Sequence, residues 1–85
     1  MAASIGEAEI QDWCLSCIRR TIEDPAVKIG PDIPFARMGL DSAKSVYFVL
    51  ELEEWLGIEL NPEIVADHPT VAELARTLAG RPMET

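Results

Sequence analysis

The pair Asp41-Ser42 is the feature of this 85-residue chain whose residue types could most readily do chemistry. It stands in the stretch "RMGLDSAKSV", residues 37 to 46, directly before a run of helix-forming residues. Either residue could cap the N-terminus of that helix. A helix N-terminus also favours an anion, such as a phosphodiester on a serine hydroxyl, through its free N–H groups and its dipole. Taken alone, the pair fits a helix cap better than an attachment site, and both interpretations stay open at this point.

Catalysis has little support in the sequence. A serine hydrolase would need His68, the only histidine, and nothing in "DHPT" orients its ring toward Ser42. The stretch "LDSAK" also lacks the G-x-S-x-G turn of a nucleophilic serine. Glu53 and Glu54 are adjacent and would point to different faces of a helix, which does not suit paired acid–base work. With no glycine-rich phosphate loop, calcium loop or metal-ligand cluster, we expect no catalytic residues and no metal site.

Cys14 and Cys17 form a C-x-x-C pair, which supplies only half of the ligands of a zinc site. At helical spacing the two side chains would point inward together, so we interpret them as reduced thiols of the core. The first twenty residues carry Glu7, Glu9 and Asp12 and no continuous apolar stretch, unlike a secretory peptide or a membrane span. These features predict a cytoplasmic protein that does not cross a membrane.

Composition predicts a single small domain, residues 1–85 with a core of about residues 5–80, built mainly on aliphatic side chains. Hydrophobic residues make up 48% of the chain and only five residues are aromatic. The net charge of −8 is concentrated in the second half, and residues 51 to 67 hold six acids and no base. Such a surface lacks the cations that nucleic acid requires. It suits a basic protein surface, although the acids could serve solubility alone.

Hydrophobic periodicity predicts a first helix over about residues 5–22, with Ser4 and Glu7 at capping-box spacing. Its inward face would hold Ile10, Trp13, Cys14, Cys17, Ile18 and Ile22. A long connection follows, over residues 24–41, with Phe35 as its best hydrophobic anchor. A connection of this length in so small a domain is often functional.

A second long helix is predicted over about residues 42–56, ended by Gly57. Its apolar stripe would consist of Phe48, Val49, Leu52, Trp55 and Leu56. Three polar side chains can stay in water, Lys44, Glu51 and Glu54, and three apolar ones are expected near the edge of the stripe, Val46, Tyr47 and Leu50.

Two further helices are predicted after Gly57. A short one over about residues 62–66 would have Asn61 as N-cap, and a last one would begin at a Thr70/Glu73 capping box. The last helix would bury Val71, Leu74, Ala75 and Leu78 and end at Gly80 and Pro82. Without a convincing strand, the pattern predicts an all-α fold. We expect a small antiparallel bundle of three long helices and one short helix, with a long first loop.

Three stretches together resemble the acyl carrier protein, or phosphopantetheine-binding carrier domain, family. They are "FARMGLDSA" (residues 35–43), "VLELEEWLGIEL" (residues 49–60) and "DHPTVAELARTL" (residues 67–78). The resemblance covers about residues 7 to 80. It is closer to the carrier domains of bacterial polyketide or mixed polyketide–peptide systems than to housekeeping fatty-acid carriers.

The resemblance implies a specific role for Ser42. This residue matches the serine that receives 4′-phosphopantetheine from coenzyme A, and Asp41 matches the acid that helps the transferase bind through its metal. The thiol of the arm would then carry acyl intermediates as thioesters. On this hypothesis the chain is a monomeric, non-catalytic substrate of partner enzymes: a phosphopantetheinyl transferase, an acyl-adenylate ligase or acyltransferase that loads it, and a ketosynthase or other synthase domain.

The resemblance also implies a docking surface around the second helix. The matching polar positions are Lys44, Tyr47, Glu51, Glu54 and Glu63, with apolar contact from Ala43, Val46 and Leu50. Ala43 departs from the Leu or Met that is common there, which should change which enzymes dock. The competing hypothesis is an acidic helical interaction module without a prosthetic group, in which Ser42 is only a cap.

Overall fold

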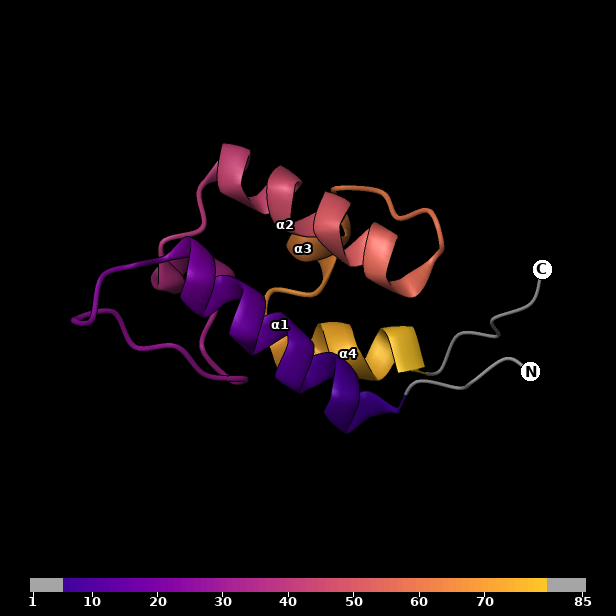
Figure 1. Ribbon diagram of the computed structural model, residues 1–85, viewed down its shortest axis with the longest axis horizontal. Helices are drawn as coiled ribbons and strands as arrows, with labels where there is room; N and C mark the ends of the chain where they lie inside the picture. Colours follow the sequence, from indigo (N-terminus) through magenta and orange to yellow (C-terminus); the bar gives the residue numbers. More distant parts are fainter. Residues whose placement is uncertain (1–5, 80–85) are drawn as a thin grey trace.

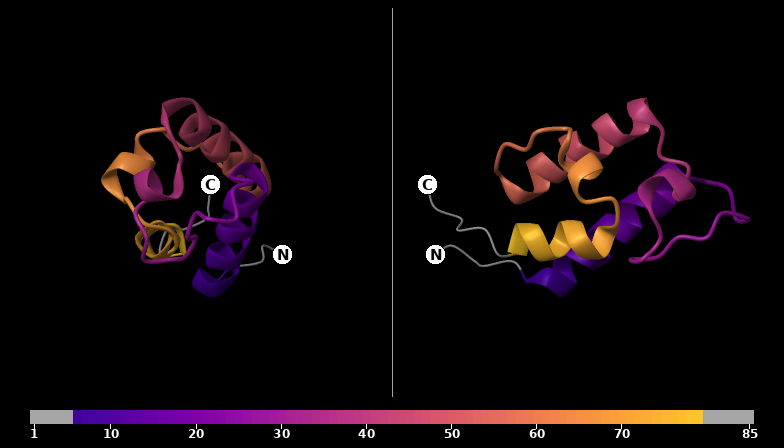
Figure 2. Two further views of the ribbon diagram at one scale, coloured as in Figure 1. Left: turned by 90° about the vertical axis from the view of Figure 1, so that its left-hand side faces the viewer. Right: turned by 180° about the vertical axis from the view of Figure 1, so that it is seen from behind.

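The computed structural model describes residues 6–79, which form four α-helices and one short 3-10 helix (Figure 1). In chain order these are α1 (Glu7–Thr21), η1 (Phe35–Met38), α2 (Ser42–Leu56), α3 (Ile64–Asp67) and α4 (Val71–Ala79). Helix α1 packs against both α4 and α2 and runs antiparallel to each (Figure 1). The short α3 lies between α2 and α4 (Figure 2). Residues 6–79 contain no strand, so the predicted all-α bundle is confirmed.

The first helix starts later than predicted. It begins at Glu7 with Gly6 as N-cap, and the Glu9 carboxylate accepts a hydrogen bond from the Gly6 N–H at 3.2 Å. The predicted capping residue Ser4 lies outside the described residues. Two acids in the first turn suit the positive end of the helix dipole.

The third helix was predicted two residues too early. The Asn61 side chain does accept a hydrogen bond, from the Glu63 N–H at 2.9 Å, but this bond closes a turn rather than a helix. A second bond, from the Ile64 N–H to the Asn61 carbonyl, completes that turn, and α3 follows it. In the last helix the Thr70 hydroxyl accepts from the Glu73 N–H at 3.2 Å, as half of a capping box does. Gly80 and Pro82 lie outside the described residues.

The core is aliphatic, as the composition predicts. Within residues 6–79, its sixteen buried residues are Ile10, Cys14, Leu15, Cys17, Ile18, Phe35, Met38, Leu40, Phe48, Val49, Leu52, Leu60, Val71, Leu74, Ala75 and Leu78. Phe48 is almost completely buried in it, and its ring centroid lies 5.7 Å from that of Phe35 and 6.4 Å from that of Trp13.

Trp55 was wrongly predicted to be part of the buried stripe of α2. Its side chain is 37% exposed and stacks on Trp13 of α1 at the surface instead of entering the core. Beside it, Leu56 is half-buried and packs against the core.

The long first connection is held in place by backbone hydrogen bonds to the first turn of α4 and to the segment before it. The Phe35 N–H donates to the Pro69 carbonyl at 2.8 Å, and the Ala72 N–H donates to the Pro31 carbonyl at 2.9 Å. Together with the buried Phe35 ring, these bonds fix the chain just before α2. None of the helices within residues 6–79 is long and apolar enough to cross a membrane.

Candidate functional site

Asp41, not Ser42, is the N-cap of α2. Its Oδ1 accepts a hydrogen bond from the Lys44 N–H at 2.9 Å, and its carbonyl accepts from the Ser45 N–H at 2.8 Å. Ser42 is therefore the first helical residue, and its side chain is exposed. Of the two caps that the sequence left open, the structure uses the acid, so the serine hydroxyl is not needed to start the helix.

A tight turn delivers Asp41 to this position. The 3-10 helix η1 ends at Gly39, whose φ of 87° lies in the left-handed region that favours glycine. The Gly39 N–H donates to the Ala36 carbonyl at 3.3 Å, and the Leu40 N–H donates to the Phe35 carbonyl at 3.2 Å. With Phe35 and Leu40 both buried, the turn is anchored on either side of the glycine.

A hollow of about 340 Å³ opens beside Ser42, between the N-terminal half of α2 and the segment around α3. Its lining comprises Leu40, Asp41, Ser42, Ser45, Val46, Pro62, Glu63 and Val65. These residues fit a flexible arm attached at Ser42. The hydroxyl is accessible, the helix N-terminus suits a phosphodiester, and the hollow offers both apolar and polar walls.

The predicted docking residues include an apolar set on α2 and two charged residues, Lys44 and Glu63. Four apolar or aromatic side chains share one exposed face of α2 that starts next to Ser42: Ala43, Val46, Tyr47 and Leu50. Three of these are 43–59% exposed, and we call this set the α2 stripe. Glu63 lines the hollow beside Ser42, whereas Lys44 is exposed on the surface of α2.

Glu51 and Glu54 are not next to Ser42. They line a second hollow, on the side of α2 that faces α1, together with Trp13, Arg20 and Trp55. Glu51 is half-buried there, and its Oε1 accepts a hydrogen bond from the Cys17 thiol at 3.1 Å. The predicted docking residues are therefore divided between two sides of α2.

Cys14 and Cys17 are buried free thiols, as predicted. Burial, reinforced by the neighbouring Cys17, raises the pKa of the Cys14 thiol to about 12. Burial and the Glu51 carboxylate raise the pKa of the Cys17 thiol to about 12 as well. Both thiols are protonated at neutral pH, which makes them poor nucleophiles.

The sequence alone did not identify two tertiary contacts made by acidic residues of α2. One is the Cys17–Glu51 contact, and the other is Glu53, whose Oε2 accepts a hydrogen bond from the Leu60 N–H and ties the end of α2 to the next loop. Neither contact follows a local motif, since the partners lie 34 and 7 residues apart.

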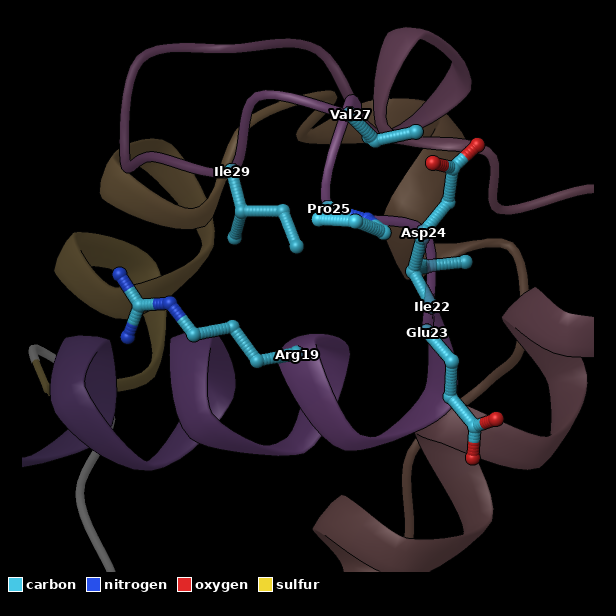
Figure 3. Close-up of a pocket in the computed structure, with 7 residues that line it drawn as sticks. All are labelled: Arg19, Ile22, Glu23, Asp24, Pro25, Val27 and Ile29. Atoms are coloured by element: carbon cyan, nitrogen blue, oxygen red, sulfur yellow. The ribbon is translucent and has the colours of Figure 1, made fainter.

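Other features lie apart from Ser42. His68 Nδ1 lies 3.4 Å from the Thr77 Oγ1, a contact between the end of α3 and α4. A further hollow of about 450 Å³ lies between the C-terminal end of α1 and the loop after it, and it is lined by Arg19 from the helix and Ile29 from the loop (Figure 3). Within residues 6–79 no three His, Cys, Asp or Glu side chains are grouped so that they could hold a metal.

Comparison with known proteins places this geometry among carriers. The family described as "Phosphopantetheine attachment site" matches residues 12–78. One large protein of the phenolphthiocerol/phthiocerol polyketide synthase of Mycobacterium tuberculosis is 35% identical over 81 residues, which are 95% of this chain. The chain spans only 4% of the length of that synthase protein. Acyl carrier protein TtuC of Teredinibacter turnerae is 27% identical over 78 residues, which are 92% of this chain and 90% of TtuC.

The fold is also similar to solved carrier structures. An acyl carrier protein from Anabaena sp. PCC 7120, with a variant phosphopantetheinylation-site sequence, superposes with a TM-score of 0.77 at 29% identity. The match covers 93% of each chain, so the similarity extends over nearly the whole fold.

Proposed function

Because this chain belongs to the phosphopantetheine attachment family of carrier domains, we propose that its Ser42 is the residue that receives 4′-phosphopantetheine. The prosthetic group of this family is covalently attached 4′-phosphopantetheine. One observation carries the assignment to Ser42: the hydroxyl is exposed at the N-terminus of α2, while the neighbouring Asp41 does the capping.

The attachment is a phosphoryl transfer from coenzyme A. The Ser42 Oγ forms a bond to the pantetheine-bearing phosphorus of the coenzyme A pyrophosphate. The bond from that phosphorus to the bridging oxygen breaks, and its electron pair leaves with adenosine 3′,5′-bisphosphate. The hydroxyl proton passes to a base of the transferase. Asp41 uses Oδ1 for the cap, and we assign its second oxygen to the metal of the transferase.

Once attached, the group supplies a thiol that holds an acyl chain as a thioester. The contribution of this chain is to present that group: Ser42 anchors it and the walls of the hollow give it a surface to lie on. Carrier domains of this family are generally not catalysts, and we propose the same for this chain. The two curated relatives named above support acyl cargo in polyketide or mixed polyketide–peptide biosynthesis.

The partners proposed for this chain are a phosphopantetheinyl transferase, an acyl-adenylate ligase or acyltransferase that loads it, and a ketosynthase or other synthase domain. For their docking surface we propose the α2 stripe, flanked by Lys44 and Glu63. Glu51 and Glu54, also predicted to contact partners, lie on the side of α2 that faces α1. An exposed apolar face of this kind is typical of an interaction site. Residues 1–85 as one domain, a monomeric state and a cytoplasmic location complete the proposal.

The experiment is to incubate the full chain with coenzyme A and a promiscuous phosphopantetheinyl transferase and to measure the intact mass. We expect a gain of one phosphopantetheine, no gain for Ser42→Ala, and a full gain for Ser45→Ala. Ser45 is a matched control because it lines the same hollow. A folded wild-type chain without a mass gain would leave the alternative, an interaction module that uses the α2 stripe without a prosthetic group.

A further inference from the structure

The seam between α1 and α2 exposes an aromatic surface that attachment at Ser42 does not use. Trp13 of α1 and Trp55 of α2 stack with ring centroids 4.8 Å apart and ring planes 7° apart. Trp13 also packs on the buried Phe48, so it is fixed from below. Trp55, the outer ring, is 37% exposed. A large indole held flat at a surface is a feature that binding sites use often.

The two indoles border the second hollow, which we call the seam hollow. It has a volume of about 330 Å³ and is lined by Trp13, Arg20, Glu51, Glu54 and Trp55. The Cys17 thiol donates a hydrogen bond to the Glu51 Oε1 and so fixes that carboxylate in the lining of the hollow. One acid is therefore fixed by the core, while the other, Glu54, is exposed.

The chemistry of the seam hollow suits a planar cation. Two carboxylates face a single positive charge, Arg20, and the surrounding segment, residues 51 to 67, contains six acids and no base. A guanidinium can stack on an indole and donate to a carboxylate in two parallel hydrogen bonds. A lysine ammonium offers neither the plane nor the fork.

The position of the seam hollow leaves Ser42 free. Trp55 follows Ser42 by thirteen residues along α2, a distance of about 20 Å at the rise of an α-helix. An arginine side chain bound in the seam hollow therefore does not contact the Ser42 hydroxyl, which does not line this hollow. This separation suits a partner that holds the carrier in one place while the arm reaches into an active site.

We propose that the seam hollow is a second docking surface, which accepts an arginine side chain presented by a partner protein. The inference rests on the proposed carrier function for the identity of the partner class, but the surface itself can be tested without the prosthetic group. Trp55 supplies the stacking face and Glu54 the accessible carboxylate, while Cys17 is a positioning residue that acts through Glu51.

The test titrates the full chain with the capped peptides Gly-Arg-Gly and Gly-Lys-Gly and follows the indole N–H signals by ¹H–¹⁵N NMR. Trp13 and Trp55 are the only tryptophans, so each of the two indole signals reports on the seam. We expect saturable shifts of these signals with the arginine peptide and weaker ones with the lysine peptide. Trp55→Leu should weaken arginine binding about threefold or more, whereas Trp55→Phe, which keeps an aromatic face, should retain most of it.

Glu54→Gln should also weaken binding, while its charge-matched control Glu59→Gln, an exposed change outside the hollow, should not. Equal effects of the two peptides would overturn the proposal, and so would shifts spread over all the acidic residues of α2 and α3. Unchanged arginine binding by a Trp55→Leu variant whose amide spectrum shows a folded chain would also overturn the proposal. The proposed carrier function is tested separately: the Trp55→Leu variant should still gain one phosphopantetheine, as measured by its intact mass.

Discussion

The Asp41 carboxylate caps α2 by accepting a hydrogen bond from the Lys44 N–H at 2.9 Å. This bond places Ser42 one residue inside the helix, where the cap does not depend on its hydroxyl. The stability of the helix start and the availability of a nucleophilic oxygen are therefore assigned to two adjacent residues. Substitutions at the two positions should have different consequences.

Replacing the serine should leave stability nearly unchanged. Ser42→Ala removes an exposed hydroxyl and introduces the best helix former, so the free energy of unfolding should change by no more than about 0.5 kcal/mol. Urea unfolding followed by circular dichroism measures this change. A loss of about 1 kcal/mol, the cost of losing a cap, would show that Ser42 rather than Asp41 stabilises the helix start.

Replacing the acid should separate its two roles. Asp41→Ala should cost about 1 kcal/mol of stability, whereas Asp41→Asn should keep the cap because asparagine is an equally good N-cap residue. Asp41→Asn removes only the charge, so its rate of modification by the transferase tests the proposed metal contact. The capping role is contradicted if the asparagine variant is as unstable as the alanine variant. The metal contact is contradicted if the asparagine variant is modified as fast as the wild type.

The turn before α2 should be sensitive at a single glycine. Gly39→Ala introduces a side chain at a φ of 87°, where its Cβ would also lie 3.4 Å from the Ile22 Cδ1. We expect a loss of at least about 1 kcal/mol, measured by thermal unfolding. Gly30→Ala is the matched control, because a Cβ there would make only ordinary contacts with Ile33. Equal stability of the two variants would contradict the importance of the left-handed turn.

The two thiols should make stability fall in alkaline solution. Their pKa values are raised from the ordinary value of 9.0 to about 12, so between those pH values the unfolded chain loses protons that the folded chain keeps. Stability is then complete below pH 9 and decreases as the pH rises, by up to about 1.4 kcal/mol per pH unit for each thiol.

Urea unfolding at a series of pH values from 7 to about 10.5 measures this slope, in a range that unfolded thiols with a pKa of 9.0 must cross. Cys17→Ala should halve the contribution of the thiols to it. A Cys17→Ala chain with the same alkaline slope as the wild type would show that this thiol does not titrate differently in the two states.

Local signals in the sequence predicted much of the fold. Gly57, with its φ of 74°, ends α2 as expected, and Phe35 anchors the long connection by burial. Trp55 could not be assigned from periodicity, because its exposure depends on how far α1 extends over the end of α2. The start of α3 was missed because Asn61 is equally able to close a turn or cap a helix.

The candidate site was predictable where it depends on local order and not where it depends on packing. The Asp41-Ser42 pair at a helix start follows from the order of residues in the chain. The separation of Glu51 from Ser42 does not, since it depends on which side of α2 faces α1 and which side faces α3. The same packing brings Trp13 onto Trp55 from a position 42 residues earlier in the chain.

The most direct measurement locates the modification on Ser42. Proteolysis after Arg37 and Lys44 releases residues 38–44, in which Ser42 is the only residue with a hydroxyl side chain. After incubation with coenzyme A and the transferase, mass spectrometry should find one phosphopantetheine on this peptide and on no other. A folded chain whose peptide 38–44 stays unmodified, or whose added mass lies in another peptide, would contradict the assignment of Ser42.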